Sequence, residues 1–278
     1  MSENFEQGGL AVSKEPMIVL TTPEERNQLQ GLPVIAAHMA YSVGAGAVLL
    51  RAQSARSLGG GYLVLNSSRY DGTGRAETFC QQVVQECQYR RFQGIVCDFE
   101  GGRLPPLEKI IHMLGEQCAN RGWNLLVSEQ YGHSSPHAIV MIPSAISGGT
   151  LEARLQEAQQ EFGQHRIALA LQRTAEDFYL PAPNGRGITL SQKELKQKIE
   201  TRNPSIFFSH EFCARYFTYM SQETGAHFVL FDDPVTMQKK VELAARLGIT
   251  TVLAAWQDIA DATRELGLFN TRKTQVLR

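Results

Sequence analysis

The sequence lacks an excess of charge of either sign, and it lacks long apolar runs. Its 27 Lys and Arg residues balance 28 Asp and Glu residues, so the formal net charge is -1. Such a chain has no electrostatic footprint for nucleic acid or an anionic membrane, and we expect neither as a partner. The longest apolar runs, 139–142 and 251–256, are strand-sized and far below the roughly 20 residues that span a bilayer.

Cysteine pairs and cofactor motifs are missing too. The five cysteines are Cys80, Cys87, Cys97, Cys118 and Cys213. They form no Cys-x-x-Cys pair, so we expect reduced, buried thiols rather than disulfides or a zinc site. No Gly-x-Gly-x-x-Gly follows a predicted strand, so we predict neither a cofactor nor a metal. Residues 1–14 contain no apolar signal-peptide core, which predicts a cytoplasmic protein.

The sequence does contain a regular alternation of short apolar runs with longer stretches of helical periodicity. We expect strands at 17–22, 47–52, 62–66, 94–100, 124–127, 138–142, 167–171 and 249–256. We expect helices at 33–42, 75–91, 105–120, 151–162 and 234–247. This alternation predicts a parallel sheet with helical crossovers, and roughly eight strands favour a closed (β/α)8 TIM barrel of the α/β class.

The segment 174–233 breaks the alternation. It is irregular, carries Pro and Gly, and includes a polar helix near 192–200. Three short runs within it predict a small antiparallel β insertion before the last helix: 206–209, 216–219 and 228–231. We predict that residues 1–278 form a single domain that includes this insertion.

Two carboxylates stand at the end of the predicted central strand, Asp98 and Glu100. Active sites of parallel barrels lie at the carboxyl ends of the strands, and residues two apart share a face. Both side chains should therefore point into the barrel mouth, where repulsion between them raises the pKa of one. A carboxyl group that keeps its proton near neutral pH is suited to general acid catalysis. The alternative is a structural Asp98, as a cap or ion pair, and a solvated Glu100.

The residues around this pair resemble a known family. Gln93-Gly-Ile-Val-Cys-Asp-Phe-Glu100 resembles the fourth-strand signature D-G-x-D-x-D-x-E of glycoside hydrolase family 18, the chitinase family. The Asp-Phe-Glu form is similar to its spore-germination, peptidoglycan-directed branch. A second resemblance covers that branch's C-terminal third: Ala214-Arg-Tyr-Phe-Thr-Tyr219, Phe228-Val-Leu-Phe-Asp-Asp-Pro234, Lys239-Lys-Val-Glu-Leu-Ala-Ala-Arg-Leu-Gly248 and a strand that ends in Trp256.

The resemblance implies substrate-assisted retaining hydrolysis of an N-acetylglucosamine-containing glycan, peptidoglycan or chitin-like. By position, Glu100 is the acid/base, and Asp98 orients the acetamido group that attacks the anomeric carbon. Trp256 is then the floor of the sugar subsite, because an aromatic face suits a pyranose. The alternative for Trp256 is simple barrel packing.

The chain also departs from the family pattern. The two earlier acids of the signature fall on Gln93 and Val96. We place Ser144 and Ala145 at the Tyr and Asp of the family's sixth-strand Met-x-Tyr-Asp, so the usual donor to the acetamido oxygen is missing. Glu129 and Tyr131, after the fifth strand, are candidates to replace some of this polarity, although Glu129 is equally interpretable as an exposed loop acid.

Two functions remain in view. The first is a glycoside hydrolase that binds an N-acetylglucosamine-containing glycan. The second is a catalytically inactive protein of the same fold that binds a saccharide or a protein. His133 and His137 lack metal-site context, and Ser128 lacks a nucleophile-elbow motif. Asp232 and Asp233 are expected to cap the following helix. The sequence gives no oligomeric state.

Overall fold

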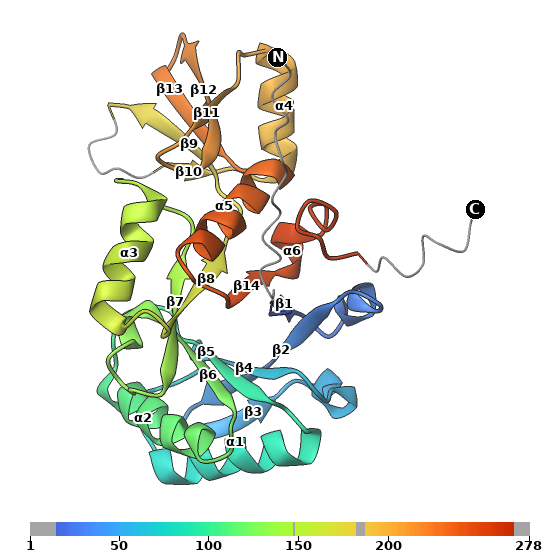
Figure 1. Cartoon of the computed structure of the whole chain (residues 1–278), viewed down its shortest axis with the longest axis vertical. Coiled ribbons are helices and arrows are strands. Elements are labelled where there is room, and N and C mark those ends of the chain that lie inside the picture. Colours follow the sequence, from blue (N-terminus) through green and yellow to red (C-terminus); the bar gives the residue numbers. More distant parts are fainter. Residues whose placement is uncertain (1–14, 147, 182–186, 270–278) are drawn as a thin grey trace, which may run out of the picture.

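A closed parallel barrel forms the body of the protein. The structure is a computed structural model that describes residues 15–146, 148–181 and 187–269. Within these residues, β14 pairs with β1 and β1 pairs with β2, all in parallel, and this pairing closes the ring (Figure 1). The eight barrel strands are β1 (Met17–Thr21), β2 (Val34–Gly44), β4 (Tyr62–Asn66), β5 (Gly94–Asp98), β6 (Asn124–Ser128), β7 (Ala138–Pro143), β8 (Ile167–Leu171) and β14 (Val252–Ala255). The predicted TIM barrel is confirmed.

Helices cover the outside of the barrel. They are α1 (Ala76–Arg90), α2 (Pro105–Ala119), α3 (Leu151–Phe162), α5 (Pro234–Arg246), the short α6 (Trp256–Ile259) and the 3-10 helices η1 (Arg26–Leu29), η2 (Gln53–Ser57) and η3 (Glu129–Tyr131). Pro105 starts α2 with its preset backbone angle. Asp233 caps α5 by accepting a hydrogen bond from the Thr236 N–H, as the sequence predicts.

Side-chain alternation divides the strands between two apolar clusters. One fills the barrel interior: Ile18, Ala37, Tyr62, Val64, Val96, Leu126, Met141, Ala168 and Leu253. The other lies between the strands and the helices, and it includes Ile95 and Cys97 of β5. Residues two positions apart on a strand point to the same side. The cluster to which one residue belongs therefore gives the direction of the side chain two positions along.

The antiparallel insertion is also confirmed. Its sheet has the order β10-β9-β13-β12-β11 and is placed between β8 and α5, with α4 (Gln192–Arg202) on one face. Figure 1 shows this sheet and α4 as a separate layer above the barrel. The strands are β9 (Ala175–Leu180), β10 (Ile188–Thr189), β11 (Phe207–Ser209), β12 (Ala214–Ser221) and β13 (Gly225–Phe231).

Two predicted elements near the N-terminus were wrong. The predicted helix at 33–42 is instead strand β2 from Val34 onward, in which Ile35 and Ala37 face the interior while Ala36 faces the shell. The run at 47–52 is not a barrel strand. It forms β3 (Val48–Arg51), which pairs antiparallel with the outer end of β2.

The remaining predictions concern the cysteines, membrane-spanning segments and cellular location. All five cysteines are free and buried, as expected. None of the helices in the described ranges is long and apolar enough to cross a membrane. The prediction of a cytoplasmic location depends on residues 1–14, which lie outside the described residues.

Candidate active site

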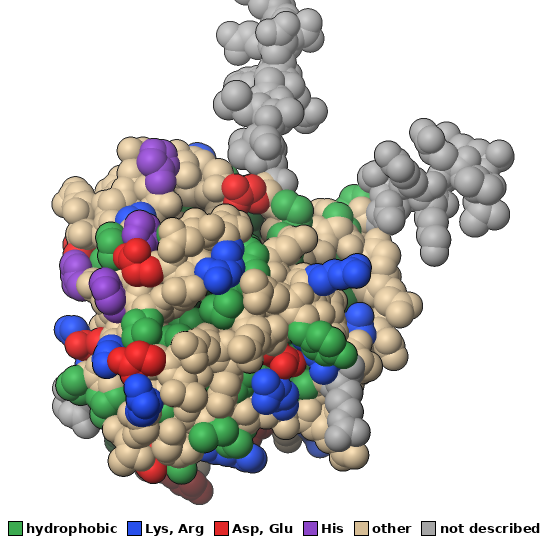
Figure 2. All heavy atoms as spheres, turned by 90° about the horizontal axis from the view of Figure 1, so that it is seen from below, with side chains coloured by type: hydrophobic (Ala, Val, Ile, Leu, Met, Phe, Trp, Pro, Cys, Tyr) green, Lys and Arg blue, Asp and Glu red, His purple; other side chains and the backbone are tan. Residues whose placement is uncertain are grey.

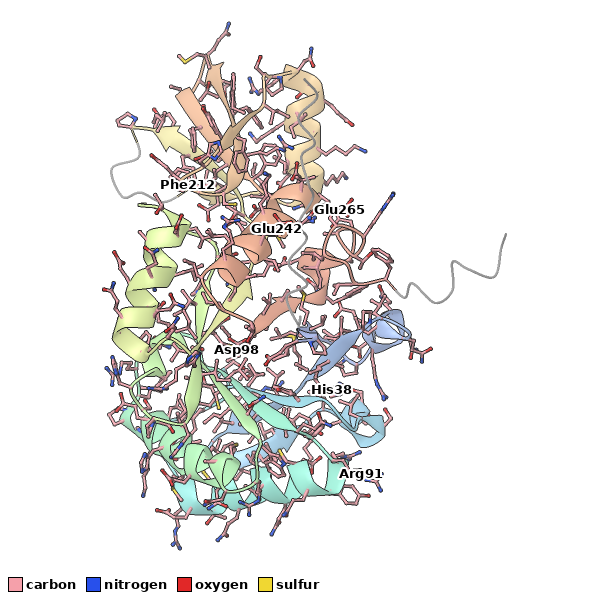
Figure 3. All side chains as sticks on the ribbon, viewed as in Figure 1. His38, Arg91, Asp98, Phe212, Glu242 and Glu265 are labelled. Atoms are coloured by element: carbon pink, nitrogen blue, oxygen red, sulfur yellow. The ribbon has the colours of Figure 1, made fainter. Side chains whose placement is uncertain are left out.

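The carboxyl ends of the barrel strands meet at one mouth. Val96 belongs to the interior cluster, so strand alternation places Asp98 on the same inner side. Figure 3 shows Asp98 toward the middle of the barrel, whereas Arg91 lies at the outer end of α1. The same alternation brings a ring of residues to the mouth: Leu20, Met39, Asn66, Asp98, Ser128, Pro143, Gln172 and Ala255. Asp98 is the one ionisable member of this described ring.

Asp98 is half-buried and unpartnered. Within the described residues its carboxylate makes no hydrogen bond or ion pair, and Glu100 beside it is exposed and likewise unpartnered. Burial, reinforced by the negative charge of Glu100, raises the pKa of Asp98 above its usual range. Asp98 thus faces the mouth, and it is the member of the expected pair whose pKa is raised.

A set of hydrogen bonds from the end of β6 fixes the loop that carries Glu100. Ser128 Oγ accepts from the Phe99 N–H at 3.1 Å, and the Gln130 amide donates to the Phe99 carbonyl at 2.7 Å. Further along, the Tyr131 hydroxyl accepts from the Leu104 N–H at 3.1 Å and lies 3.4 Å from the Gly102 carbonyl. Glu100 is therefore held between two anchored stretches of backbone.

Tyr131 and Glu129 both make contacts within the protein. Tyr131 is fully buried, and its ring packs edge-on against Phe99, so it positions the loop and offers no surface to a ligand. Glu129 forms an ion pair with Arg154 of α3. Glu129 and Arg154 line a hollow of about 270 Å³ at the rim of the mouth, together with Pro143 and Ala145.

The structure corrects the placement of Ser144. Met141 faces the interior, so the residue two positions on that faces the mouth is Pro143, and Met-x-Tyr spacing also leads to Pro143. Ser144 is fully buried. Its hydroxyl accepts from the Gln172 N–H at 2.9 Å and donates to the Gln172 carbonyl at 3.2 Å. Ser144 therefore has no free group for a substrate, and Pro143 has no side-chain donor.

Trp256 does not form an open floor. Its side chain is 7% exposed and packs in the shell cluster rather than in the barrel interior. Its indole Nε1 donates to the side chain of Gln28, a residue of η1, at 2.8 Å. This packing leaves little ring face for a pyranose, and the residue that faces inward at the end of β14 is Ala255.

Other candidates resolve into separate local pairs. His133 pairs with Glu161 and His137 with Glu116. No group of three or more His, Cys, Asp or Glu in the described ranges could hold a metal ion. Figure 2 shows the molecule from below relative to Figure 1, and on this face histidines lie toward one edge, with basic and acidic side chains interspersed. The side chains of Gln130 and Gln172 were missed at the sequence level, because only the folded strand ends show their position.

Comparison with known proteins gives the fold a context. No protein-family model and no curated protein matches the chain. The spore cortex-lytic enzyme SleL of Bacillus megaterium QM B1551 matches with a TM-score of 0.64 and 14% identity, over 92% of this chain and 74% of that chain. A chitinase from Chromobacterium violaceum ATCC 12472 matches with a TM-score of 0.62 and 16% identity, over 91% and 99%.

A third structure is a GH18 chitinase from Cycas revoluta in complex with (GlcNAc)3. Its TM-score is 0.58 at 10% identity, over 91% of this chain and 97% of that chain. At such identities the likeness is one of fold. This chain therefore has the barrel fold shared by glycoside hydrolase family 18 chitinases and by a spore cortex-lytic enzyme.

Proposed function

We propose that this protein is a glycoside hydrolase that acts on an N-acetylglucosamine-containing polysaccharide. One observation carries the proposal. A half-buried carboxyl group, Asp98, faces the barrel mouth without any partner in the described chain and lies two residues before an exposed carboxyl group, Glu100. An unpaired buried carboxyl group is costly for stability, and such costs are typical of functional sites.

The chemistry follows from the two carboxyl groups. Glu100 donates a proton to the glycosidic oxygen, and the bond between that oxygen and the anomeric carbon breaks. The carbonyl oxygen of the 2-acetamido group attacks the anomeric carbon and forms an oxazolinium intermediate. Asp98 accepts a hydrogen bond from the acetamido N–H and holds that group in place. Glu100, now a carboxylate, then takes a proton from the water that opens the intermediate, so the anomeric configuration is retained.

The substrate class has two forms, peptidoglycan and chitin-like glycan. The motif at 93–100 resembles the peptidoglycan-directed branch, and one structural neighbour carries the name of a cortex-lytic enzyme. Others are chitinases. Both polymers present N-acetylglucosamine, which is the group that the proposed mechanism requires.

A second candidate is a saccharide-binding protein of the same fold without turnover. Pro143 occupies the position of the tyrosine donor, and Trp256 is packed in the shell. Removing one preorganised donor costs about 100-fold to 1,000-fold in rate. These two observations support binding without catalysis.

Hydrolysis by wild type and by Glu100→Gln separates these functions. The substrates are a chromogenic chitobioside and purified peptidoglycan. We expect the variant to lose about 100-fold to 10,000-fold in kcat/KM with an unchanged circular dichroism spectrum. Glu157→Gln, an exposed substitution on α3, is the matched control and should keep full activity.

Equal activity of Glu100→Gln and wild type would remove Glu100 from the mechanism. Binding of N-acetylglucosamine oligomers by a wild type that turns over neither substrate would establish the second candidate instead.

A further inference from the structure

Among the residues that the structure describes at the barrel mouth, one uncharged polar side chain has unused hydrogen-bonding groups. Among the polar members of the described ring, Asn66 is engaged with the Tyr41 carbonyl at 3.2 Å and with Ser68 at 2.7 Å. Ser128 is engaged with the backbone of β5 and its loop. Gln172 is exposed, and within the described residues its carboxamide has no hydrogen-bond partner.

Strand alternation gives the direction of Gln172. Ala168 lies in the interior cluster and Ala170 packs against it, whereas Leu171 is buried in the shell. The side chain of Arg173 is also turned from the mouth, 6% exposed and paired with Asp261. Gln172 therefore continues the inward series of β8 at the point where the strand opens into the mouth.

The backbone of Gln172 is fixed from the neighbouring strand. The buried Ser144 hydroxyl both accepts from its N–H and donates to its carbonyl, at 2.9 and 3.2 Å. The Ser144 N–H also donates to the Ala170 carbonyl at 2.9 Å. A side chain on such a clamped backbone is preorganised, because only its own χ rotations remain to be fixed on binding.

Gln172 also lies across the ring from Asp98, so that the two side chains can contact opposite sides of one bound sugar. Two strands, β6 and β7, separate it from β5, so Gln172 and Asp98 are three steps apart in a ring of eight strands. Three strand spacings correspond to about 14 Å around the barrel wall. An eight-stranded barrel has room at its mouth for one small ligand. A sugar placed there meets an acceptor on one side, Asp98, and an amide donor on the other.

We propose that Gln172 is a specificity-determining residue that donates from its carboxamide to the acetamido carbonyl oxygen of the bound sugar. The proposal rests on the glycan-directed function proposed above. It assigns to Gln172 the donor that Pro143 cannot provide. Ser144 is a positioning residue in this scheme, since it acts through the backbone of Gln172.

The test compares acetylated with deacetylated ligand. Tri-N-acetylchitotriose and the glucosamine trimer are titrated calorimetrically into Glu100→Gln, which slows turnover, with and without Gln172→Ala. We expect Gln172→Ala to weaken binding of the acetylated trimer about fivefold, the value of one hydrogen bond. Binding of the glucosamine trimer should stay unchanged. Gln197→Ala, an exposed glutamine of α4, is the matched control and should alter neither.

Kinetics and a double-mutant cycle complete the test. With Glu100 intact, Gln172→Ala should lower kcat/KM about 100-fold. Ser144→Ala should weaken acetyl preference in wild type but add nothing to Gln172→Ala, because both act on one contact. An acetyl preference unchanged in Gln172→Ala overturns this inference while hydrolysis by wild type leaves the proposed function standing. A wild type that neither binds nor cleaves the acetylated trimer overturns both.

Discussion

The half-buried Asp98 of the barrel and the buried Asp177 of the insertion have opposite electrostatic environments. Asp98 makes no hydrogen bond within the described residues, and burial raises its pKa. Asp177 of β9 is 6% exposed, and it accepts from Tyr219 Oη at 2.8 Å, His227 Nδ1 at 2.8 Å and Lys198 Nζ at 3.0 Å. Burial alone would raise the pKa of Asp177, but these donors together lower it.

The difference separates structural from functional use of a buried charge. Asp177 joins two strands of the insertion to α4, and each of its oxygens is occupied. Asp232 is used in the same way, since it binds Lys240 Nζ at 2.6 Å and the Thr174 N–H at 2.8 Å. Asp98 has the burial without the partners, so its hydrogen-bonding capacity is free for a ligand. The comparison therefore predicts opposite effects when each carboxylate is removed.

The largest expected effect is on stability. Asp177→Ala should lower the free energy of unfolding by about 3 kcal/mol, the lower end for breaking a buried pair, because Lys198 reaches solvent. Asp98→Ala should leave the free energy of unfolding at or above that of wild type, because it removes an uncompensated charge. Urea unfolding followed by circular dichroism measures both. If Asp98→Ala lost as much free energy of unfolding as Asp177→Ala, the distinction between a functional Asp98 and a structural Asp177 would be contradicted.

The pH dependence of stability sharpens the same comparison. The folded-state pKa of Asp98 is raised, so the folded protein holds its proton more tightly than the unfolded chain does. The free energy of unfolding, measured relative to Asp98→Asn, should therefore fall as the pH rises from the ordinary aspartate pKa of about 3.9 through the folded pKa. A single titrating carboxyl group can contribute a slope of at most about 1.4 kcal/mol for each pH unit in that window.

Asp177 should show the reverse. Its folded-state pKa is lowered, so its stabilisation is present above the ordinary value and is lost as the pH falls through the folded pKa. Denaturant unfolding of wild type, Asp98→Asn and Asp177→Asn across the acid range gives both curves. Slopes of equal sign for the two aspartates would show that their environments do not differ as described.

The barrel was predictable where the chemistry is local. Strands such as β5 and β8, buried on both faces, appear in the sequence as continuous apolar runs between helical stretches. Strand β2 was missed because its alanine-rich run after Pro33 also fits a helix, and only pairing with β1 and β4 decides. The prediction that residues 1–278 form a single domain stays a prediction.

The site was predictable only in part for a similar reason. Asp98 ends β5, so the direction of its side chain follows from the alternation of the apolar run before it, whereas Glu100 lies in the loop beyond the strand. Ser144 and Gln172 directly follow two different strands, and their contact depends on the register of β7 with β8. Tyr131 illustrates the same limit, because its burial against Phe99 depends on the packing of η3.

The smallest expected effect concerns Trp256, which the family resemblance assigns to the sugar floor. The chain has two tryptophans, Trp256 in the shell at the mouth end and Trp123 just before β6 at the opposite end. Trp256→Phe removes the hydrogen bond to Gln28 and should cost about 1 kcal/mol of stability. The dissociation constant for tri-N-acetylchitotriose should change less than about twofold, since a single lost hydrogen bond elsewhere leaves the ligand contacts intact. Trp123→Phe is the matched control, and each variant retains one indole whose fluorescence reports its own surroundings. The contrary outcome is a large loss of glycan binding in Trp256→Phe while ligand leaves the emission of the remaining Trp123 unchanged. It would mean that the buried indole of Trp256 turns into the mouth when a glycan binds. Trp256 would then be the floor of the sugar subsite, as the resemblance implies.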